Sequence, residues 1–281
     1  MKTLVLASLG MIGLIVGLSI AVAGGMFRSA VPVTDDLSSG SRASAPPIAT
    51  AEPAATADEA AEARRGMTAL EQASEADKYL FAMIWDAENE QTAAMRQVVS
   101  TAAEASEQAD SVFVQVTDPA EREFVRKFRL THASMPLILV IAPNGAVTGG
   151  LSYPCEAQDL LDAFTSPAMA ATLLPLQKGK VVLLCVQNDS TDLNDQALQG
   201  VHDFAHDPSF ADLAEVVMVD PRDSAEASFL SDLRIDPQTS VALTVLLVPP
   251  ASVAAVFEGE TTRDLLLSTL RSCGPGGCAP R

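Results

Sequence analysis

The sequence predicts an α/β protein that contains two small domains of the same kind. Short, continuous apolar runs bounded by polar residues, such as Tyr79–Trp85, are typical of the central strands of a sheet. Segments with apolar residues at three- and four-residue steps, such as 88–105, alternate with these runs and indicate amphipathic helices. The same order of segments occurs again about 102–106 residues further along the chain, a separation of one ordinary domain length.

Each copy is expected to have the order helix, strand, helix, strand, helix, strand, strand, helix. The third helix of the first copy carries three start signals: Asp118 can cap it, Pro119 suits its first position, and Glu121 can complete a capping box. The expected segments of the first copy are, in order, 67–78, 79–85, 88–105, 111–116, 117–128, 136–142, 146–151 and 155–164.

The second copy repeats the first at the level of individual residues. Segment 228–235 aligns with 123–130 so that a phenylalanine and an arginine fall at the same positions in both. The strand at 242–249 aligns with the strand at 136–142, and Ala242 takes the place of Pro136. The segments expected in the second copy include 179–188, 192–205, 215–221, 228–235, 242–249 and 260–270.

The first residues are expected to direct the chain to or across a membrane. No charged residue lies between Lys2 and Arg28, and residues 4–23 are long enough to cross a bilayer as a helix. One interpretation is an uncut, single-pass anchor with its N-terminus in the cytoplasm. The other is a signal peptide cleaved near Ala23, which gives a secreted or periplasmic protein. Gly13 and Gly17 match the small-residue dimer motif of membrane helices, so a homodimer through them is possible.

The segment that follows is rich in Ala, Pro, Ser and Thr and has no aromatic residue, so it cannot bury enough apolar surface to form a core. It is expected to be a flexible spacer. The predicted organisation of the whole chain is therefore a signal anchor or signal peptide, a linker, two domains and a short tail, at residues 1–27, 28–66, 67–170, 171–271 and 272–281.

The balance of charge excludes some classes of function. The formal net charge is -18, from 36 acidic and 18 basic residues. Such a chain repels phosphate backbones, so we expect no nucleic-acid partner. Neither glycine-rich phosphate motif occurs, and no convincing set of metal ligands is present, so no cofactor or metal is expected.

These features together resemble the thioredoxin-like family over residues 67–270. The order of elements, the Trp85 that ends the first strand, and Met135-Pro136 before a later strand carry the resemblance. The family implies a central mixed sheet flanked by helices in each domain and a cis peptide bond before Pro136. It also implies that a groove beside Met135 and Pro136 contacts an extended polypeptide, with Trp85 nearby.

The chemistry of active members of that family is absent from both copies. Their C-x-x-C motif begins four residues after the tryptophan, which places the thiol positions on Asn89 and Thr92, and on Thr191 and Asn194 in the second copy. Neither an amide nor a hydroxyl can form a mixed disulfide. The resemblance therefore predicts a redox-inactive binding or scaffold protein of the cell envelope, with Asn89 and Thr92 at the edge of the groove and an unidentified protein as partner.

The four cysteines lie elsewhere and keep an enzymatic alternative open. Cys273 and Cys278 flank a Gly/Pro-rich turn near the end of the chain. They can form a small disulfide, bind a soft metal incompletely, or act as a displaced redox couple. In the last case the protein is a thiol-disulfide oxidoreductase, in which Cys155 exchanges with the pair. A helix start can make Cys155 somewhat acidic, but a lone structural thiol is the favoured interpretation of this residue. Cys185 lies in the middle of a strand and is expected to be inert.

Overall fold

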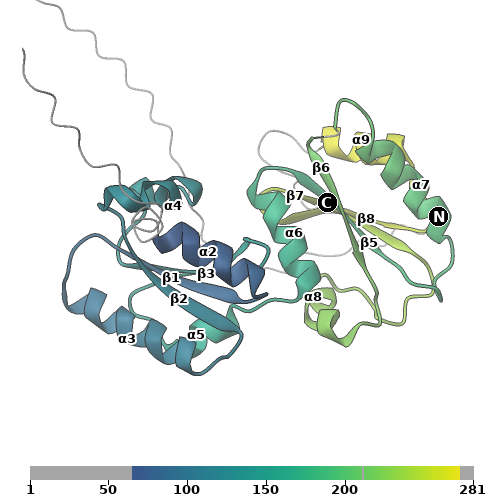
Figure 1. The fold of residues 1–281 in the computed structure, drawn as a ribbon. Helices are drawn as coiled ribbons and strands as arrows, with labels where there is room; N and C mark the ends of the chain where they lie inside the picture. The colour runs from purple at the N-terminus through teal and green to yellow at the C-terminus, as the bar shows by residue number, and fades with distance from the viewer. Residues whose placement is uncertain (1–64, 211, 273–281) are drawn as a thin grey trace, which may run out of the picture.

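The computed structural model describes residues 65–210 and 212–272, and both halves have the predicted order of helices and strands (Figure 1). The main elements of the first half are α2 (Arg65–Glu75), β1 (Tyr79–Trp85), α3 (Glu90–Glu104), β2 (Ala109–Gln115), α4 (Arg122–Lys127), β3 (Leu137–Ile141), β4 (Val147–Ser152) and α5 (Ala157–Asp162). Those of the second half are α6 (Pro167–Gln177), β5 (Val181–Val186), α7 (Asn194–Ala205), β6 (Ala214–Val219), α8 (Ala227–Asp232), β7 (Leu243–Val248), β8 (Ser252–Glu258) and α9 (Arg263–Ser272).

Several predicted features lie outside the described residues. They are the membrane or signal segment with Gly13, Gly17 and Ala23, residues 28–64 of the predicted linker, and the Cys273/Cys278 pair. The last two residues of the predicted linker, Arg65 and Gly66, instead belong to α2, so the first domain begins two residues earlier than predicted. Within 65–210 and 212–272, no helix is both long enough and apolar enough to cross a bilayer.

Each half forms one four-stranded mixed sheet, in the order β2-β1-β3-β4 and β6-β5-β7-β8. β1 pairs parallel with β2 and antiparallel with β3, and β3 pairs antiparallel with β4; the second sheet repeats this pattern. β1 is a central strand whose interior residues are all buried, which explains its unbroken apolar run.

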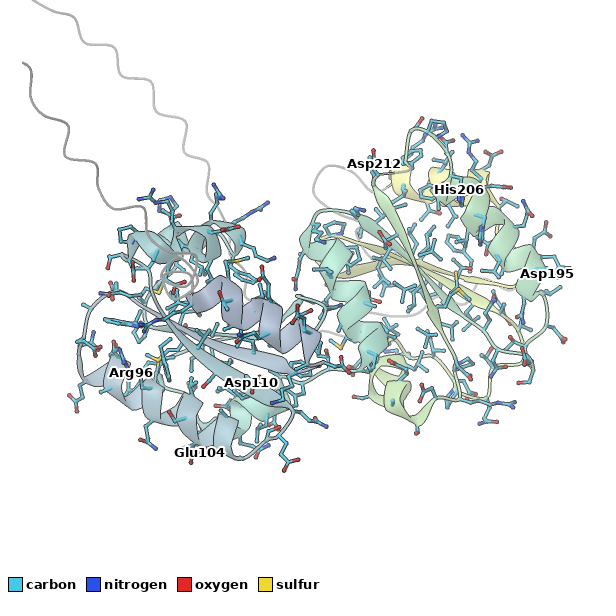
Figure 2. The ribbon with its side chains drawn as sticks, in the orientation of Figure 1. Arg96, Glu104, Asp110, Asp195, His206 and Asp212 are labelled. Atoms are coloured by element: carbon cyan, nitrogen blue, oxygen red, sulfur yellow. The ribbon has the colours of Figure 1, made fainter. Side chains whose placement is uncertain are left out.

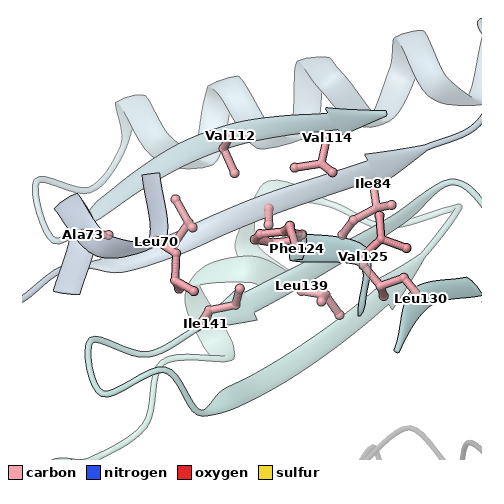
Figure 3. Close-up of a cluster of buried hydrophobic side chains, with 12 residues drawn as sticks. Leu70, Ala73, Ile84, Val112, Val114, Phe124, Val125, Leu130, Leu139 and Ile141 are labelled. Atoms are coloured by element: carbon pink, nitrogen blue, oxygen red, sulfur yellow. The ribbon is translucent and has the colours of Figure 1, made fainter. Parts of the chain in front are cut away.

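The core of the first domain lies on both faces of this sheet. Ala82 and Ile84 of β1 face a cluster that α2 and α4 cover (Figure 3). Phe81 and Met83 point to the opposite face, where α3 and α5 cover a second cluster. The alternation follows from the two-residue period of a strand. Each large apolar side chain that is fully buried in these clusters contributes about 1.5–3 kcal/mol to the free energy of folding.

The outer surfaces carry the charge that the composition requires. Glu104 on α3 and Asp195 on α7 project away from their domains (Figure 2). These two carboxylates therefore lie on the solvated faces of their helices, while apolar clusters cover both faces of each sheet.

In the loop before α4, Asp118 acts as the predicted cap, whereas Glu121 has a different role from the predicted one. Asp118 accepts a hydrogen bond from the N–H of Ala120 and precedes a 3-10 turn, Pro119–Glu121. The prediction that Glu121 completes a local capping box is wrong. Its side chain is buried and accepts the N–H of Gly66, at 3.2 Å for Oε1 and 3.1 Å for Oε2. Glu121 therefore caps α2, 55 residues away in the sequence.

The second domain repeats this arrangement. Asp223 caps the matching 3-10 turn, and the buried Glu226 accepts the N–H of Ala168 at the start of α6 at 2.9 Å. The two aligned arginines also agree in backbone conformation, since Arg129 and Arg234 are left-handed with φ values of 55° and 58°. The alignment of the two copies therefore holds at the level of single residues.

Helix α6 joins the two domains. It packs on the second sheet through residues such as Leu176, while Ala170 and Leu173 pack against Ala142 and Ala146 of the first domain. The predicted domain boundary between residues 170 and 171 falls inside this helix. Two polar contacts reinforce the junction: the Gln177 amide side chain bonds both backbone groups of Val147, and the Tyr79 hydroxyl donates to the carbonyl of Thr165.

Candidate functional site

The thiol positions of the first domain lie where β1 ends and α3 begins. Asn89 is the N-cap of α3, and its Oδ1 accepts the N–H of Thr92 at 2.9 Å. The Thr92 hydroxyl donates to the carbonyl of Ala87, also at 2.9 Å. The two polar side chains therefore hold the loop from Trp85 to Asn89, the Trp85 loop, in one conformation.

The two residues differ in what they can contact. Asn89 is exposed, whereas Thr92 is fully buried. The expectation that Thr92 lines the edge of a groove therefore does not fit its position. Its hydroxyl and amide are used inside the loop, and it supports the residues around it.

An arginine that the sequence did not single out covers the Trp85 loop. The guanidinium of Arg96 lies over the Trp85 ring, 4.8 Å from its centroid, and 5.6 Å from that of Phe113. It also forms an ion pair with Glu88 (Arg96 is labelled in Figure 2). This contact holds the indole between a cation and the core. No sequence rule would find it, since Trp85, Glu88 and Arg96 have no diagnostic spacing.

The other side of the site is the segment 133–136, the Met135 segment. The peptide bond between Met135 and Pro136 is cis, as the resemblance implied. β1 and β3 pair Ile84 with Leu137, so continuing this register places Pro136 across from Trp85. Pro136 is buried, while Met135 is half-buried and packs against the core cluster under α4.

The backbone of the Met135 segment has spare hydrogen-bonding capacity. Among the backbone hydrogen bonds outside helices and strands in the described residues, Ala133 donates to Leu130, but none uses the N–H or C=O of Met135. Pro136 has no N–H to donate. Ser134 beside them is exposed.

The equivalent segment of the second domain is closed. The N–H of Asp192 donates to the carbonyl of Ser240 at 2.8 Å, and the N–H of Ala242 donates to the carbonyl of Asp192 at 2.9 Å. This pairing forms an isolated parallel bridge between Asp192 and Val241. Ala242 can make the second bond because it has the N–H that Pro136 lacks.

The thiol positions of the second domain are also bonded to each other. The Thr191 hydroxyl lies 2.7 Å from Oδ1 of Asn194, and the Asn194 amide donates to the carbonyl of Asn188 at 2.8 Å. Asn and Thr thus occupy both pairs of positions in opposite order, and in both domains their hydrogen bonds stay within the loop.

The two cysteines of the described part are separate and weakly acidic. Cys155 packs against the core of the first domain and Cys185 lies in the core of the second. Burial, and then the charge of Asp159, raise the pKa of Cys155, which agrees with the structural thiol favoured from the sequence rather than with an acidic one. Burial raises the pKa of Cys185 to about 12. Neither thiol is poised to react at neutral pH.

A cavity of about 450 Å³ opens in the second domain beside α8. Leu230, Arg234, Ile235 and Asp236 are among its lining residues, so the thiol positions and Ala242 take no part in it.

Both sheets have the strand order and directions of the thioredoxin-like fold, and the protein therefore consists of two tandem thioredoxin-like domains. Comparison with solved structures finds several of low similarity. One is the first two thioredoxin domains of Saccharomyces cerevisiae Eps1p, with 12% identity, a TM-score of 0.27, and coverage of 80% of this chain and 99% of that one.

Two further similar structures come from a bacterium and from human. The NTD_N/C domain of alkylhydroperoxide reductase AhpF from Enterococcus faecalis has 16% identity and a TM-score of 0.25, over 72% of this chain and 97% of that one. Human ERp44 in its zinc-bound form has 10% identity and a TM-score of 0.29, over 75% and 55%. No family model and no curated protein matches the sequence.

Proposed function

We propose that this protein is a non-catalytic binding or scaffold protein of the cell envelope, tethered to the membrane or exported. Its first domain binds an extended segment of a partner protein at the Met135 segment. The observation that carries this proposal is the difference between the two domains, because Met135 keeps an unused backbone while Ser240 and Ala242 bond to Asp192.

An unused N–H and C=O beside a sheet can form hydrogen bonds with an incoming extended chain. These backbone bonds supply affinity that does not depend on the partner's sequence. In the second domain the pairing is internal, so a partner strand would have to displace two hydrogen bonds. In the first domain, the partly buried Met135 supplies apolar surface for the partner's side chains. The exposed Asn89 amide can add a polar contact.

The test is peptide binding followed by the fluorescence of Trp85, which is the single tryptophan of the chain. The full chain is purified in detergent and titrated with unstructured, tryptophan-free peptides of mixed sequence. We expect a saturable change that Ser134→Tyr abolishes, because the new ring covers the Met135 backbone.

The second domain provides a matched control. Ser240 is the counterpart of Ser134 and is also exposed, so Ser240→Tyr adds the same ring at the equivalent place. It should leave binding unchanged. A complete absence of binding, or equal loss in both variants, contradicts the proposal.

The oxidoreductase alternative has its own measurement, the reduction of a model disulfide by the wild type and by Cys273→Ser. Turnover that disappears in the variant favours the enzyme. Absence of turnover in both favours the binding protein.

A further inference from the structure

We infer that the partner segment is acidic and that the exposed cations of α4 recognise it beside the Met135 segment. This inference rests on the proposed function and adds the chemical class of the partner. It combines the position of a basic cluster, here called the α4 cations, with the unused backbone next to it. The cluster consists of Arg122, Arg126 and Lys127 of α4 and of Arg129, which follows the end of that helix.

The α4 cations are unusual in a protein of net charge -18. All four side chains are exposed, and none forms an ion pair with a described residue. The same holds for Arg222 and Arg271 of the second domain, whereas Lys78, Arg96, Lys180 and Arg263 do form such pairs. Among the residues from 119 to 135 there are four Arg or Lys against two Glu, and one of those two, Glu121, is buried under α2. Among the described residues, this stretch therefore carries an excess of exposed positive charge, and such an excess attracts an acidic partner.

The chain places this cluster next to the open backbone. A 3-10 turn, Leu130–His132, follows Arg129 directly and ends at Ala133, the first residue of the Met135 segment. Phe128, Ala133 and Met135 pack against the same core cluster that α4 covers. The helix and the Met135 segment therefore pack on the same part of the core. A strand bound along the Met135 segment would therefore extend past these cations.

The second domain serves as an internal comparison. Its α8 has the same fold position as α4, but Ala227, Ser231 and Asp232 stand where Arg122, Arg126 and Lys127 stand in the first domain. Arg234 alone keeps its charge. The domain whose segment is closed has thus lost the cations, and the domain whose segment is open carries them. General solubility does not account for this coincidence, because the rest of the chain is acidic.

The experiment uses three fluorescent peptides of about twelve residues with the same apolar centre and flanks of glutamate, glutamine or lysine. The full chain in detergent should bind the glutamate peptide about tenfold more tightly than the glutamine peptide at low salt, since several exposed charge pairs act together. The lysine peptide should bind most weakly. The advantage of glutamate should shrink strongly in about 0.5 M salt, where screening is nearly complete.

Two variants locate the effect. Arg122→Glu with Arg126→Glu should reduce the affinity for the glutamate peptide to that for the glutamine peptide, which itself should not change. The control, Arg222→Glu with Arg271→Glu, reverses two exposed cations of the second domain that form no ion pair with a described residue, and it should change neither affinity. If the charge reversal impairs folding, as judged by circular dichroism, Arg122→Gln with Arg126→Gln replaces it.

The possible failures are distinguishable. If the glutamate and glutamine peptides bind equally and Ser134→Tyr abolishes both, the inference that the partner is acidic is wrong. The proposed function is then still supported. Absence of binding to every peptide overturns both. A membrane is the competing occupant: if the charge reversal abolishes a preference for anionic over neutral vesicles while peptide affinities stay unchanged, the cations serve a lipid surface and the inference is wrong.

Discussion

Replacing Gly66 by alanine tests the contact between the start of α2 and the buried Glu121. A Cβ atom at Gly66 would lie 2.7 Å from Oε2 of Glu121, 2.8 Å from Cδ2 of Phe124 and 2.9 Å from its Cγ. The carboxylate can move, but Phe124 is fully buried in the core and cannot. The helix must therefore shift away from the ring, or Glu121 must give up hydrogen bonds.

The expected decrease in the free energy of unfolding follows from opposing contributions. Overpacking a core typically costs about 1–3 kcal/mol. A buried carboxylate that loses its donor adds about 1–3 kcal/mol, whereas alanine gains at most about 1 kcal/mol in helix propensity. We expect Gly66→Ala to lower the free energy of unfolding by about 2 kcal/mol. With a typical urea dependence of about 1–3 kcal/mol per molar, the midpoint should fall by about 1 M.

The assay is urea denaturation followed by the fluorescence of Trp85, which lies in the affected domain. The counterpart of Gly66 is Ala168, which already has a Cβ and still donates its N–H to Glu226. Ala168→Gly is therefore the reciprocal control and should cost no more than about 1 kcal/mol. An unchanged or higher midpoint in Gly66→Ala would refute the close approach of α2 to Glu121 and Phe124.

Three other predictions concern single groups. Burial raises the pKa of Glu121 above 4.5, so the folded state keeps a proton that the unfolded chain has lost, and stability declines as the pH rises through that window. Glu121→Gln should flatten this decline in urea midpoints measured against pH. Iodoacetamide should modify Cys155 more slowly than a free cysteine peptide at pH 7.5, and Cys185 more slowly still, as mass spectrometry can follow; rapid labelling of Cys155 would contradict its raised pKa. Ala242→Pro removes the bond to Asp192, so hydrogen exchange at the Asp192 amide should accelerate; unchanged protection would show that the bond does not hold the segment closed.

The order of elements could be predicted because each signal is local. The apolar run 79–85 became β1, and the predicted helix 88–105 became α3 with two residues fewer at its start and one fewer at its end. Asp118 capped the turn that its neighbours indicated. The side-chain period of a strand or helix, and the preference of Asp for a cap, act over a few residues and can be recognised without a partner.

The candidate site was predictable only in part. The thiol positions and the cis bond before Pro136 followed from counting along the chain. The burial of Thr92 and the position of Arg96 over Trp85 did not, because they depend on how α3 packs against the sheet.

The sequence by itself determined that this protein has two similar α/β domains and that neither carries sulfur at the thiol positions. Both facts are properties of residue order and repeat. Tertiary structure decided that Glu121 caps a helix 55 residues away and that Asp192 closes the second domain by bonding to Ser240 and Ala242. Contacts of this kind join residues at no fixed separation, and their energy depends on burial and geometry that exist only after the chain has folded.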